Sequence, residues 1–312
     1  MPPGRIGATL RGMAEPTLGQ DVLREALAQS AEEQRRAERA ARVAVRHEEA
    51  LAECASQLRE FHLRMAAVHR QVERRHLAAA AVHRSFAERV RVWCAAVAPP
   101  EDAPSLVLTP MILAAVADSA DARGAAVTLF GPQREELLSA ASDGRVKSVQ
   151  DLEFVCGEGP ARTCDRLRRA VTATGAELAM RWPVFGPAAV RLGVHALASV
   201  PIEVGRRQVG ALTVYEPGVS RGAADLDLLR TIAGTIHRIA LADGGRPIQP
   251  SPLFAEADWH DAVHQATGIV AVQRGCSLAD ALALVKARAF ATDVPVDDLA
   301  ADIVARRVRL VD

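Results

Sequence analysis

The stretch HALASVPIEVGRRQVGALTVYEP, residues 195–217, decides the fold of the central part of the chain. Two runs rich in β-branched residues flank Gly205, and this pattern predicts a β-hairpin with the glycine in its turn. Upstream, GAAVTLFG (124–131) and ELLSAASDG (136–144) predict two further strands joined by a turn. Because helical patterns precede and follow these antiparallel strands, we expect an α+β domain.

Two breaks in composition separate this domain from helical segments on either side. APPEDAPS (98–105) and DGGRPIQPSP (243–252) are rich in residues that end helices. We therefore expect a multidomain α+β protein. Its expected parts are a disordered N-terminus (1–19), a helical coiled-coil segment for dimerisation (20–97), an α+β domain (105–242), a linker (243–255) and a helical domain (256–312).

Within that domain, SLVLTPMILAAVADSADA (105–122) predicts a helix before the strands. The stretch AADLDLLRTIAGTIHRIALAD (223–243) predicts the closing helix. Its apolar residues share one face, as expected of a helix that packs on a sheet: Leu226, Leu229, Ile232, Ala233 and Ile236.

The N-terminal helical segment contains neither Pro nor Gly between residues 20 and 97, and it shows a seven-residue apolar period. The repeat predicts a two-chain coiled coil, since a heptad pattern keeps one seam facing a partner helix. The alternative is a long amphipathic helix packed on the central domain. The seam consists of Leu51, Leu58, Met65, Val72, Ala79, Phe86 and Trp93, with Cys54, Phe61, Val68 and Val82 between them and Arg75 and Arg89 as exceptions.

A second stripe follows this seam, formed by His62, His69, His76 and His83 at the same spacing of seven. Successive histidines lie about 10 Å apart along a helix, which disfavours a metal site. We expect a solvated flank of the coiled coil, and a pH-dependent interface is the alternative.

Composition excludes several classes of protein. The formal net charge is zero, so nucleic-acid binding requires a local patch rather than a global field. Neither a signal peptide nor an apolar run of membrane-spanning length is evident, so we expect a cytoplasmic protein. The five scattered cysteines, without a CxxC pair, indicate free thiols in a reducing compartment.

The segment from 258 to 312 divides into three amphipathic helices. The first spans about 259–274, with Val263, Ala266, Ile269 and Val270 toward the interior. Ser277 is a suitable N-cap for the second helix, and Pro295 suits the start of the third. The expected apolar stripe of the second helix consists of Leu278, Ala281, Leu282, Val285 and Ala289.

The strings FVCGEGPARTC, RWPVFGPAAVRLGVHALASVPIEVGRRQVGALTVY and the closing helix resemble a GAF domain of the actinobacterial type. This resemblance implies a six-stranded antiparallel sheet with helices on one side and a small-molecule or signal-sensing pocket on the other. The cofactor and the ligand of that pocket are unknown, since the polar set for cyclic nucleotides and the context for a bilin cysteine are missing. His195 is a candidate haem ligand, but a structural role is favoured because it lies at the start of a predicted strand.

Cys156 and Cys164 flank the GEGP loop and permit three interpretations. Some GAF-fold proteins reduce methionine sulfoxide with loop cysteines, which requires an exposed thiolate of low pKa and a resolving partner. A redox-sensing disulfide is the second interpretation. Two inert thiols are the third and the favoured one, and the chain is not expected to be an enzyme.

The C-terminal helices resemble an ANTAR domain, the RNA-binding output module of bacterial antitermination regulators. The resemblance implies binding of paired RNA hairpins with six-base loops near a transcription terminator. It rests on four motifs: Ala266-Thr267-Gly268 where the family has A-K-G, the helix break Gly275-Cys276-Ser277, the second-helix set Ala281, Val285, Lys286 and Ala289, and the pair Leu299-Ala300.

Recognition of RNA loop bases needs close backbone approach together with amide or guanidinium donors. The expected RNA-binding residues are Gln265, Ala266, Thr267, Gly268, Gln273, Arg274, Lys286, Arg288, Arg306 and Arg307. Two observations oppose this expectation. Thr267 replaces the family lysine, and residues 258–312 carry six Arg and Lys against eight Asp. A local basic cluster that also includes Arg309 would have to attract the RNA.

The sequence therefore predicts a dimeric, signal-responsive transcription regulator that binds RNA and controls antitermination. The alternatives are a sensor or scaffold without RNA output and a GAF-fold thiol oxidoreductase. The bare, hydrogen-bonding face of the first C-terminal helix is the feature that favours the RNA-binding regulator over both.

Overall fold

The computed structural model describes residues 15–53, 56–96, 108–204, 207–218, 224–241, 260–292 and 294–310. The chain forms two compact units, residues 1–107 and residues 108–312, which are described separately. The expected linker 243–255 and residues 1–14 of the expected disordered N-terminus lie outside the described residues. The first helix already begins at Glu15.

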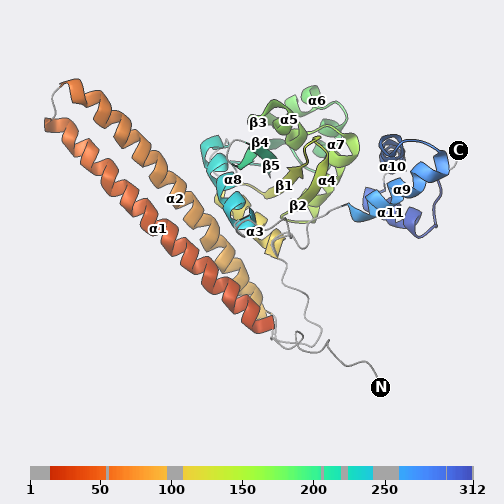
Figure 1. Cartoon of the computed structure of the whole chain (residues 1–312), viewed down its shortest axis with the longest axis horizontal. Coiled ribbons are helices and arrows are strands. Elements are labelled where there is room, and N and C mark those ends of the chain that lie inside the picture. Colours follow the sequence, from red (N-terminus) through yellow and green to blue (C-terminus); the bar gives the residue numbers. More distant parts are fainter. Residues whose placement is uncertain are drawn as a thin grey trace, which may run out of the picture. The chain divides into compact units, whose positions relative to one another are not determined.

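The first unit is a helical hairpin. Helices α1 (Glu15–Glu53) and α2 (Ser56–Ala96) run side by side, as Figure 1 shows. They are antiparallel, and the hydroxyl of Ser30 donates to the carbonyl of Ala80 at 3.0 Å across the pair. The predicted helical segment 20–97 therefore forms two helices instead of one long coiled-coil helix, because α1 ends at Glu53 and α2 returns along it.

The seam between α1 and α2 uses small and polar side chains. On α1 a heptad of buried residues faces α2: Ala26, Ser30, Glu33, Ala37, Ala40 and Ala44. On α2 the matching row contains the histidine stripe, alternating with Ala66, Glu73, Ala80 and Ala87. His76 Nδ1 lies 2.6 Å from the carboxylate of Glu33, and His62 Nδ1 lies 2.9 Å from His47 Nδ1. The histidines are thus part of the seam and not a solvated flank.

Ala79, Val82 and Phe86 of the predicted apolar seam are buried, whereas part of its first half lies outside this interface. The side chains of Leu58, Phe61 and Val68 are 53%, 48% and 49% exposed. On α2, the predicted apolar row and the row of alanines and histidines are offset by one residue. The small alanines of α1 let the two helices approach closely along the row of alanines and histidines. The apolar row in this half of α2 is left facing solvent.

The second unit contains a five-stranded antiparallel sheet in the order β2-β1-β5-β4-β3. The predicted strands form β1 (Gly124–Phe130) and β2 (Glu136–Ala141), and the quoted hairpin forms β4 (Ala196–Val204) and β5 (Arg207–Tyr215). β3 (Val171–Thr174) was not predicted. The described residues therefore form five strands where the resemblance implied six.

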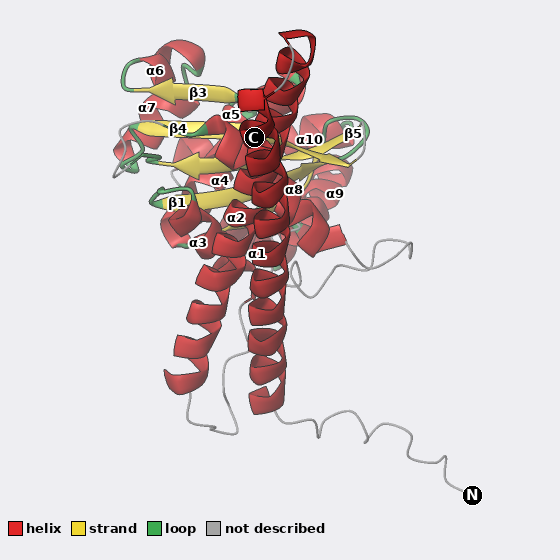
Figure 2. Ribbon diagram, turned by 90° about the vertical axis from the view of Figure 1, so that its left-hand side faces the viewer, coloured by secondary structure: helices red, strands yellow, loops and turns green. Residues whose placement is uncertain are grey.

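Helices cover both faces of the sheet, whereas the resemblance implied helices on one side (Figure 2). Helices α3 (Leu108–Ser119) and α8 (Leu226–Leu241), both predicted, lie on one face. The other face was not predicted to carry helices. Its core joins the sheet to α4 (Gly144–Cys156), α5 (Pro160–Leu167), α6 (Glu177–Arg181) and α7 (Phe185–Arg191).

The C-terminal bundle consists of α9 (Asp261–Arg274), α10 (Leu278–Thr292) and α11 (Val296–Val304), as predicted. The hydroxyl of Ser277 accepts from the Asp280 amide at 3.1 Å and so caps α10. Leu278 is exposed instead of lying on the apolar stripe, because it precedes the first turn that packs on α9. The stretch PVDDLAADIVARRVRL, residues 295–310, predicts a longer third helix, but α11 ends at Val304. The core includes Val263, Ala266, Val270, Ala281, Val285, Ala289, Leu299, Ala300 and Ile303.

Within the described residues, no single helix combines the length and hydropathy needed to cross a membrane. Helices α9 and α10 reach that criterion only when taken together, and they are bent by 109° where they meet.

Candidate nucleic-acid interface

A groove on the C-terminal bundle gathers much of the predicted RNA-binding set. It has a volume of about 550 Å³ and lies along one face of α9, beside the segment that follows α11. Spacings of three, four, seven and eight residues from Gln265 put its α9 residues on one side of the helix. The groove is lined by Gln265, Gly268, Ile269, Val272, Gln273, Arg306 and Arg309.

Two backbone features shape this groove. A Cβ atom at Gly268 would meet no other atom within 4 Å, so the groove side of α9 is open at this residue. Arg306 adopts a left-handed conformation with φ of 61°, an uncommon state for a residue with a side chain. This turn reverses the chain after α11 and brings Arg306 and Arg309 beside α9.

Two of the predicted contact residues face the interior. Ala266 is fully buried in the bundle core, and Thr267 is buried with its hydroxyl donating to the Val263 carbonyl at 2.7 Å. Ala266 thus lies toward the interior as predicted, but neither side chain contributes to the bare outer face. Consecutive helical residues point about 100° apart, so only Gln265 and Gly268 of this run share the open face.

The remaining predicted residues are dispersed. Arg274 and Arg288 are exposed but do not line the groove. Arg307 is paired with Asp302, with 2.7 Å between its Nε and the carboxylate oxygen. Lys286 is half-buried and donates to the carbonyl of Phe154 in α4 at 2.7 Å. The structure therefore brings together Gln265, Gly268, Gln273 and Arg306.

The groove also contains Val272, which sequence reasoning did not select. Its side chain is 85% exposed, the most exposed of the large apolar side chains described. A signal was present, because Val272 lies seven residues after Gln265 and therefore on the same polar face. An exposed apolar side chain between amides offers a surface on which a base can pack.

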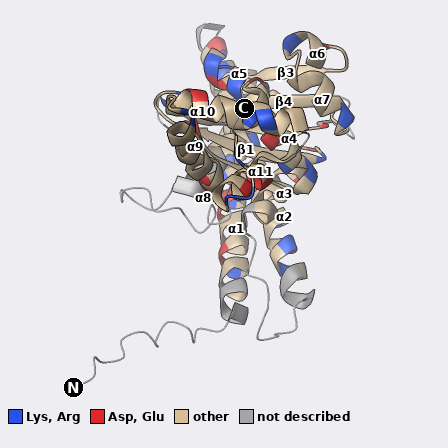
Figure 3. Ribbon diagram, turned by 90° about the vertical axis from the view of Figure 1, so that its right-hand side faces the viewer, with Lys and Arg blue, Asp and Glu red and all other residues tan. Residues whose placement is uncertain are grey.

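The charges around the groove differ from those of the bundle as a whole. Both signs of charge occur over the bundle in Figure 3, and acidic residues outnumber basic ones from 258 to 312. Among the described residues that line the groove, however, two are arginines and none is acidic. The groove is thus a local patch favourable to phosphate on a bundle whose overall charge is not.

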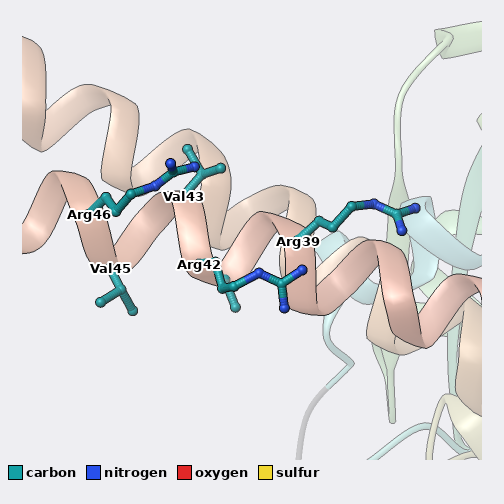
Figure 4. A pocket seen from close by; sticks show the side chains of 6 residues that line it. Arg39, Arg42, Val43, Val45 and Arg46 are labelled. Atoms are coloured by element: carbon teal, nitrogen blue, oxygen red, sulfur yellow. The ribbon is translucent and has the colours of Figure 1, made fainter.

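A second hollow, of about 650 Å³, lies on α1 of the other unit. Its lining residues come from one short run of that helix: Arg39, Ala41, Arg42, Val43, Val45 and Arg46. Figure 4 shows the arginines pointing away from different sides of α1 rather than toward a common point. Arg39 also pairs with Glu32 at 3.2 Å. These side chains do not converge on one ligand.

The GEGP loop, residues 157–160, joins three helices of the central domain. Gly157 ends α4 in a left-handed conformation, with φ of 69°. The carboxylate of Glu158 accepts from the amides of Val184 and Phe185 at 2.6 and 2.9 Å, which ties the loop to the start of α7. A Cβ atom at Gly159 would lie 2.5 Å from the carboxyl carbon of Glu153. These contacts indicate that the loop has a structural role, because it connects α4 to α5 and α7.

The two cysteines beside this loop have little thiolate character. Burial, and then a bond to Ser199 acting in the opposite direction, leaves the pKa of Cys164 raised to about 12. Burial also raises the pKa of Cys156 to about 11, and the nearby Glu158 adds to the shift. Redox and oxidoreductase chemistry needs a thiolate near neutral pH, so these values favour inert thiols.

Glu153 lies fully buried beneath the same loop. Its carboxylate accepts from the amide of Arg162 at 2.9 Å, at the start of α5. Burial is the largest cause that raises the pKa of Glu153, to about 7. A buried carboxyl with this pKa changes its charge near neutral pH, which makes the α4–α5 junction responsive to protons.

No protein-family model matches the sequence, and no curated protein matches it either. The assignment of function therefore depends on the groove, the loop and the residues that form them.

Proposed function

We propose that this chain is a signal-responsive transcription regulator whose C-terminal bundle binds RNA hairpins and thereby controls antitermination. The observation that carries the proposal is the groove beside α9, where two amides and two arginines surround an exposed valine and an open glycine. The similarity of the bundle to an ANTAR domain supports the same function.

The groove offers the chemistry that recognition of an unpaired RNA loop requires. Gln265 and Gln273 supply donors and acceptors for base edges, and Gly268 permits close approach of the backbone. Arg306 and Arg309 supply charge for phosphate oxygens, in the absence of any overall attraction from the bundle. Thr267 is not needed in this arrangement, because the position of the family lysine faces inward here.

In this proposal the central domain is the sensor, as its resemblance to a GAF domain implies. Its ligand is an unidentified small molecule. The raised pKa values of Cys156 and Cys164 disfavour redox sensing and an oxidoreductase function. The proposed signal is therefore the binding of a small molecule to the central domain.

The proposal also includes self-association of the chain, because binding a pair of RNA hairpins requires two copies of the C-terminal bundle. The exposed row of Leu58, Phe61 and Val68 has the spacing of a coiled-coil seam and lies outside the α1–α2 contact. Two α1–α2 helical hairpins, one from each chain, would form a four-helix bundle if they buried these rows against each other. We propose this row, rather than a single long helix, as the dimer interface.

The test is titration of the purified full chain with a two-hairpin RNA and with a scrambled RNA of the same length. We expect preference for the paired hairpins. The double variant Arg306→Gln/Arg309→Gln should lower the affinity roughly tenfold and reduce the salt slope by about 1 for each lost phosphate contact. Arg288→Gln, an exposed arginine outside the groove, is the matched control and should change affinity little. Equal affinity for both RNAs would refute specific recognition.

One observation favours a second function. The excess of acidic residues from 258 to 312 weakens overall attraction to RNA, an attraction that a bundle binding another protein does not require. A scaffold of this kind would bind neither RNA and would be indifferent to the arginine substitutions.

A further inference from the structure

One side chain of the central domain reaches into the C-terminal bundle. Phe154, near the end of α4, is buried in the same core cluster as Val263, Val285 and Ile303 of the bundle. Val155 packs against this cluster as well. The bundle core is therefore completed by a residue that belongs to the proposed sensor.

The Phe154 ring is held between an imidazole and an ammonium group. The ring of His260 stacks on it, with 3.9 Å between centroids and 16° between planes. The Nζ atom of Lys286 lies 3.5 Å from the Phe154 centroid. Groups this close cannot share one face of the ring without overlapping, so they occupy opposite faces. Stacking and cation–π attraction both hold the ring in place.

Charged groups surround this contact. The buried carboxylate of Glu136 lies 3.6 Å from His260 Nε2 and 2.7 Å from a guanidinium nitrogen of Arg162. At the edge of the contact, Lys147 of α4 reaches Asp297 of α11 at 3.2 Å. The central domain therefore contacts the bundle at the start of α9, on α10 and on α11.

This contact withdraws one expected RNA-binding residue. Lys286 donates to the Phe154 carbonyl at 2.7 Å, and its ammonium also lies over the ring of the same residue. Burial lowers the pKa of Lys286 to about 8, as expected for an amine taken out of water. An ammonium held in this way is not available to a phosphate.

We propose that Phe154 is an autoinhibitory clamp, which holds Lys286 away from RNA until a signal in the central domain moves the end of α4. This inference rests on the proposed function and assigns its regulation to one side chain. The helix that carries Phe154 ends at Gly157 and leads directly into the GEGP loop, which contacts α5 and α7. A change at that loop reaches Phe154 through one turn of helix.

The decisive variant is Phe154→Leu, which retains an apolar side chain and removes the ring that His260 and Lys286 hold. We expect this variant to bind the two-hairpin RNA about tenfold more tightly. Without the ring, a larger fraction of the molecules has Lys286 free to bind RNA. Phe290→Leu, which changes an exposed aromatic residue of α10 outside the clamp, is the matched control and should leave the affinity unchanged. Adding Lys286→Gln to Phe154→Leu should remove most of the gain.

Hydrogen exchange of the full chain without RNA provides an independent measurement. Phe154→Leu should increase exchange in peptides from the end of α4 and the start of α9, while Phe290→Leu should not. Unchanged exchange, or increased exchange with unchanged RNA affinity, would overturn the clamp while the proposed function stands. If neither the wild type nor Phe154→Leu distinguishes the two-hairpin RNA from the scrambled RNA, the proposed function fails and the clamp fails with it.

Discussion

The helical hairpin and the C-terminal bundle are both built from helices alone, yet they use their large apolar side chains differently. The bundle encloses aliphatic side chains such as Val285 and Ile303. The hairpin buries mostly alanines along α1, buries Val82, Phe86 and Val90 in the second half of α2, and exposes Leu58 and Phe61 in the first half. Three helices around a common axis leave space that large side chains must fill, whereas two helices can approach until alanines touch.

The difference shows that apolar periodicity identifies a helical face but not what covers it. In the bundle, each helix buries one apolar stripe. Helix α2 carries two heptad rows one residue apart, and α1 selects the row that matches its own alanines.

The largest effect is expected in the bundle. Ile303→Ala removes a buried aliphatic side chain and leaves a cavity between α9 and α11, and such changes cost about 2–5 kcal/mol. Urea-dependent hydrogen exchange of α11 peptides in the full chain would measure the loss. Val272→Ala, at the exposed residue of the groove, should cost no more than about 0.5 kcal/mol. Similar losses for the two variants would mean that the bundle has no defined core.

Buried carboxylates also distinguish the regions. Glu33 in the hairpin is paired with His76 and Arg36. In the central domain, burial raises the pKa of Glu153 to about 7. A carboxyl whose pKa rises on folding contributes stability that is present below its ordinary value of 4.5 and lost as pH rises through about 7. Glu153→Gln removes this pH-dependent loss. Its free energy of unfolding relative to wild type should therefore rise between pH 4.5 and 7, by about 3 kcal/mol.

Measurement of unfolding by denaturant between pH 4.5 and 8 would give this difference directly. Glu158→Gln is a useful comparison, since its carboxylate bonds two amides of the same loop. A gain for Glu153→Gln that is constant with pH would show that the carboxyl does not titrate in this window.

Much of the fold was predictable because its signals are local. The strands of the quoted hairpin and the three C-terminal helices follow from periodicity and from caps such as Ser277. β3 has only four residues, too few for a periodic signal, and α5 to α7 are equally short. The first half of the hairpin seam was mispredicted, because the choice between two heptad rows depends on α1, where the apolar period is lost.

The site was predictable to a similar depth. Gln265, Gly268 and Gln273 follow from one polar helix face. Arg306 joins them only because the chain turns with positive φ after α11, and the pattern gives no sign of that turn. The engagement of Lys286 depends on Phe154, which is 132 residues away in sequence.

The hairpin seam should be sensitive to larger side chains. Ala44→Leu places a bulky group between helices that are packed at alanine distance, and we expect a cost of about 1–3 kcal/mol. Leu58→Ala, which removes an exposed side chain, should cost about 0.5 kcal/mol or less in the monomeric chain. Thermal unfolding with parallel sedimentation separates the two effects. A larger loss for Leu58→Ala would restore the apolar row as the main stabilising seam.

The smallest effect is expected at the histidine cluster near the end of the hairpin. His47 Nδ1 lies 2.9 Å from His62 Nδ1, and its ring stacks on that of His69 at 6.0 Å. Partial burial, followed by the neighbouring His62, His69 and Arg46, lowers the pKa of His47 below its ordinary value of 6.5. A base with a lowered pKa contributes stability that is present above 6.5 and lost as pH falls through the lowered value.

Protection of α1 peptides against hydrogen exchange, corrected for the intrinsic rate, should therefore fall modestly between pH 7.5 and 5.5. His47→Gln should flatten this dependence, because glutamine carries no charge at either pH. His76→Gln is the informative counterpart, since a charged His76 gains Glu33 as a partner and the cluster at His47 offers no carboxylate within it. If both variants flatten the dependence equally, the stripe responds to pH as a whole and His47 has no special part in it.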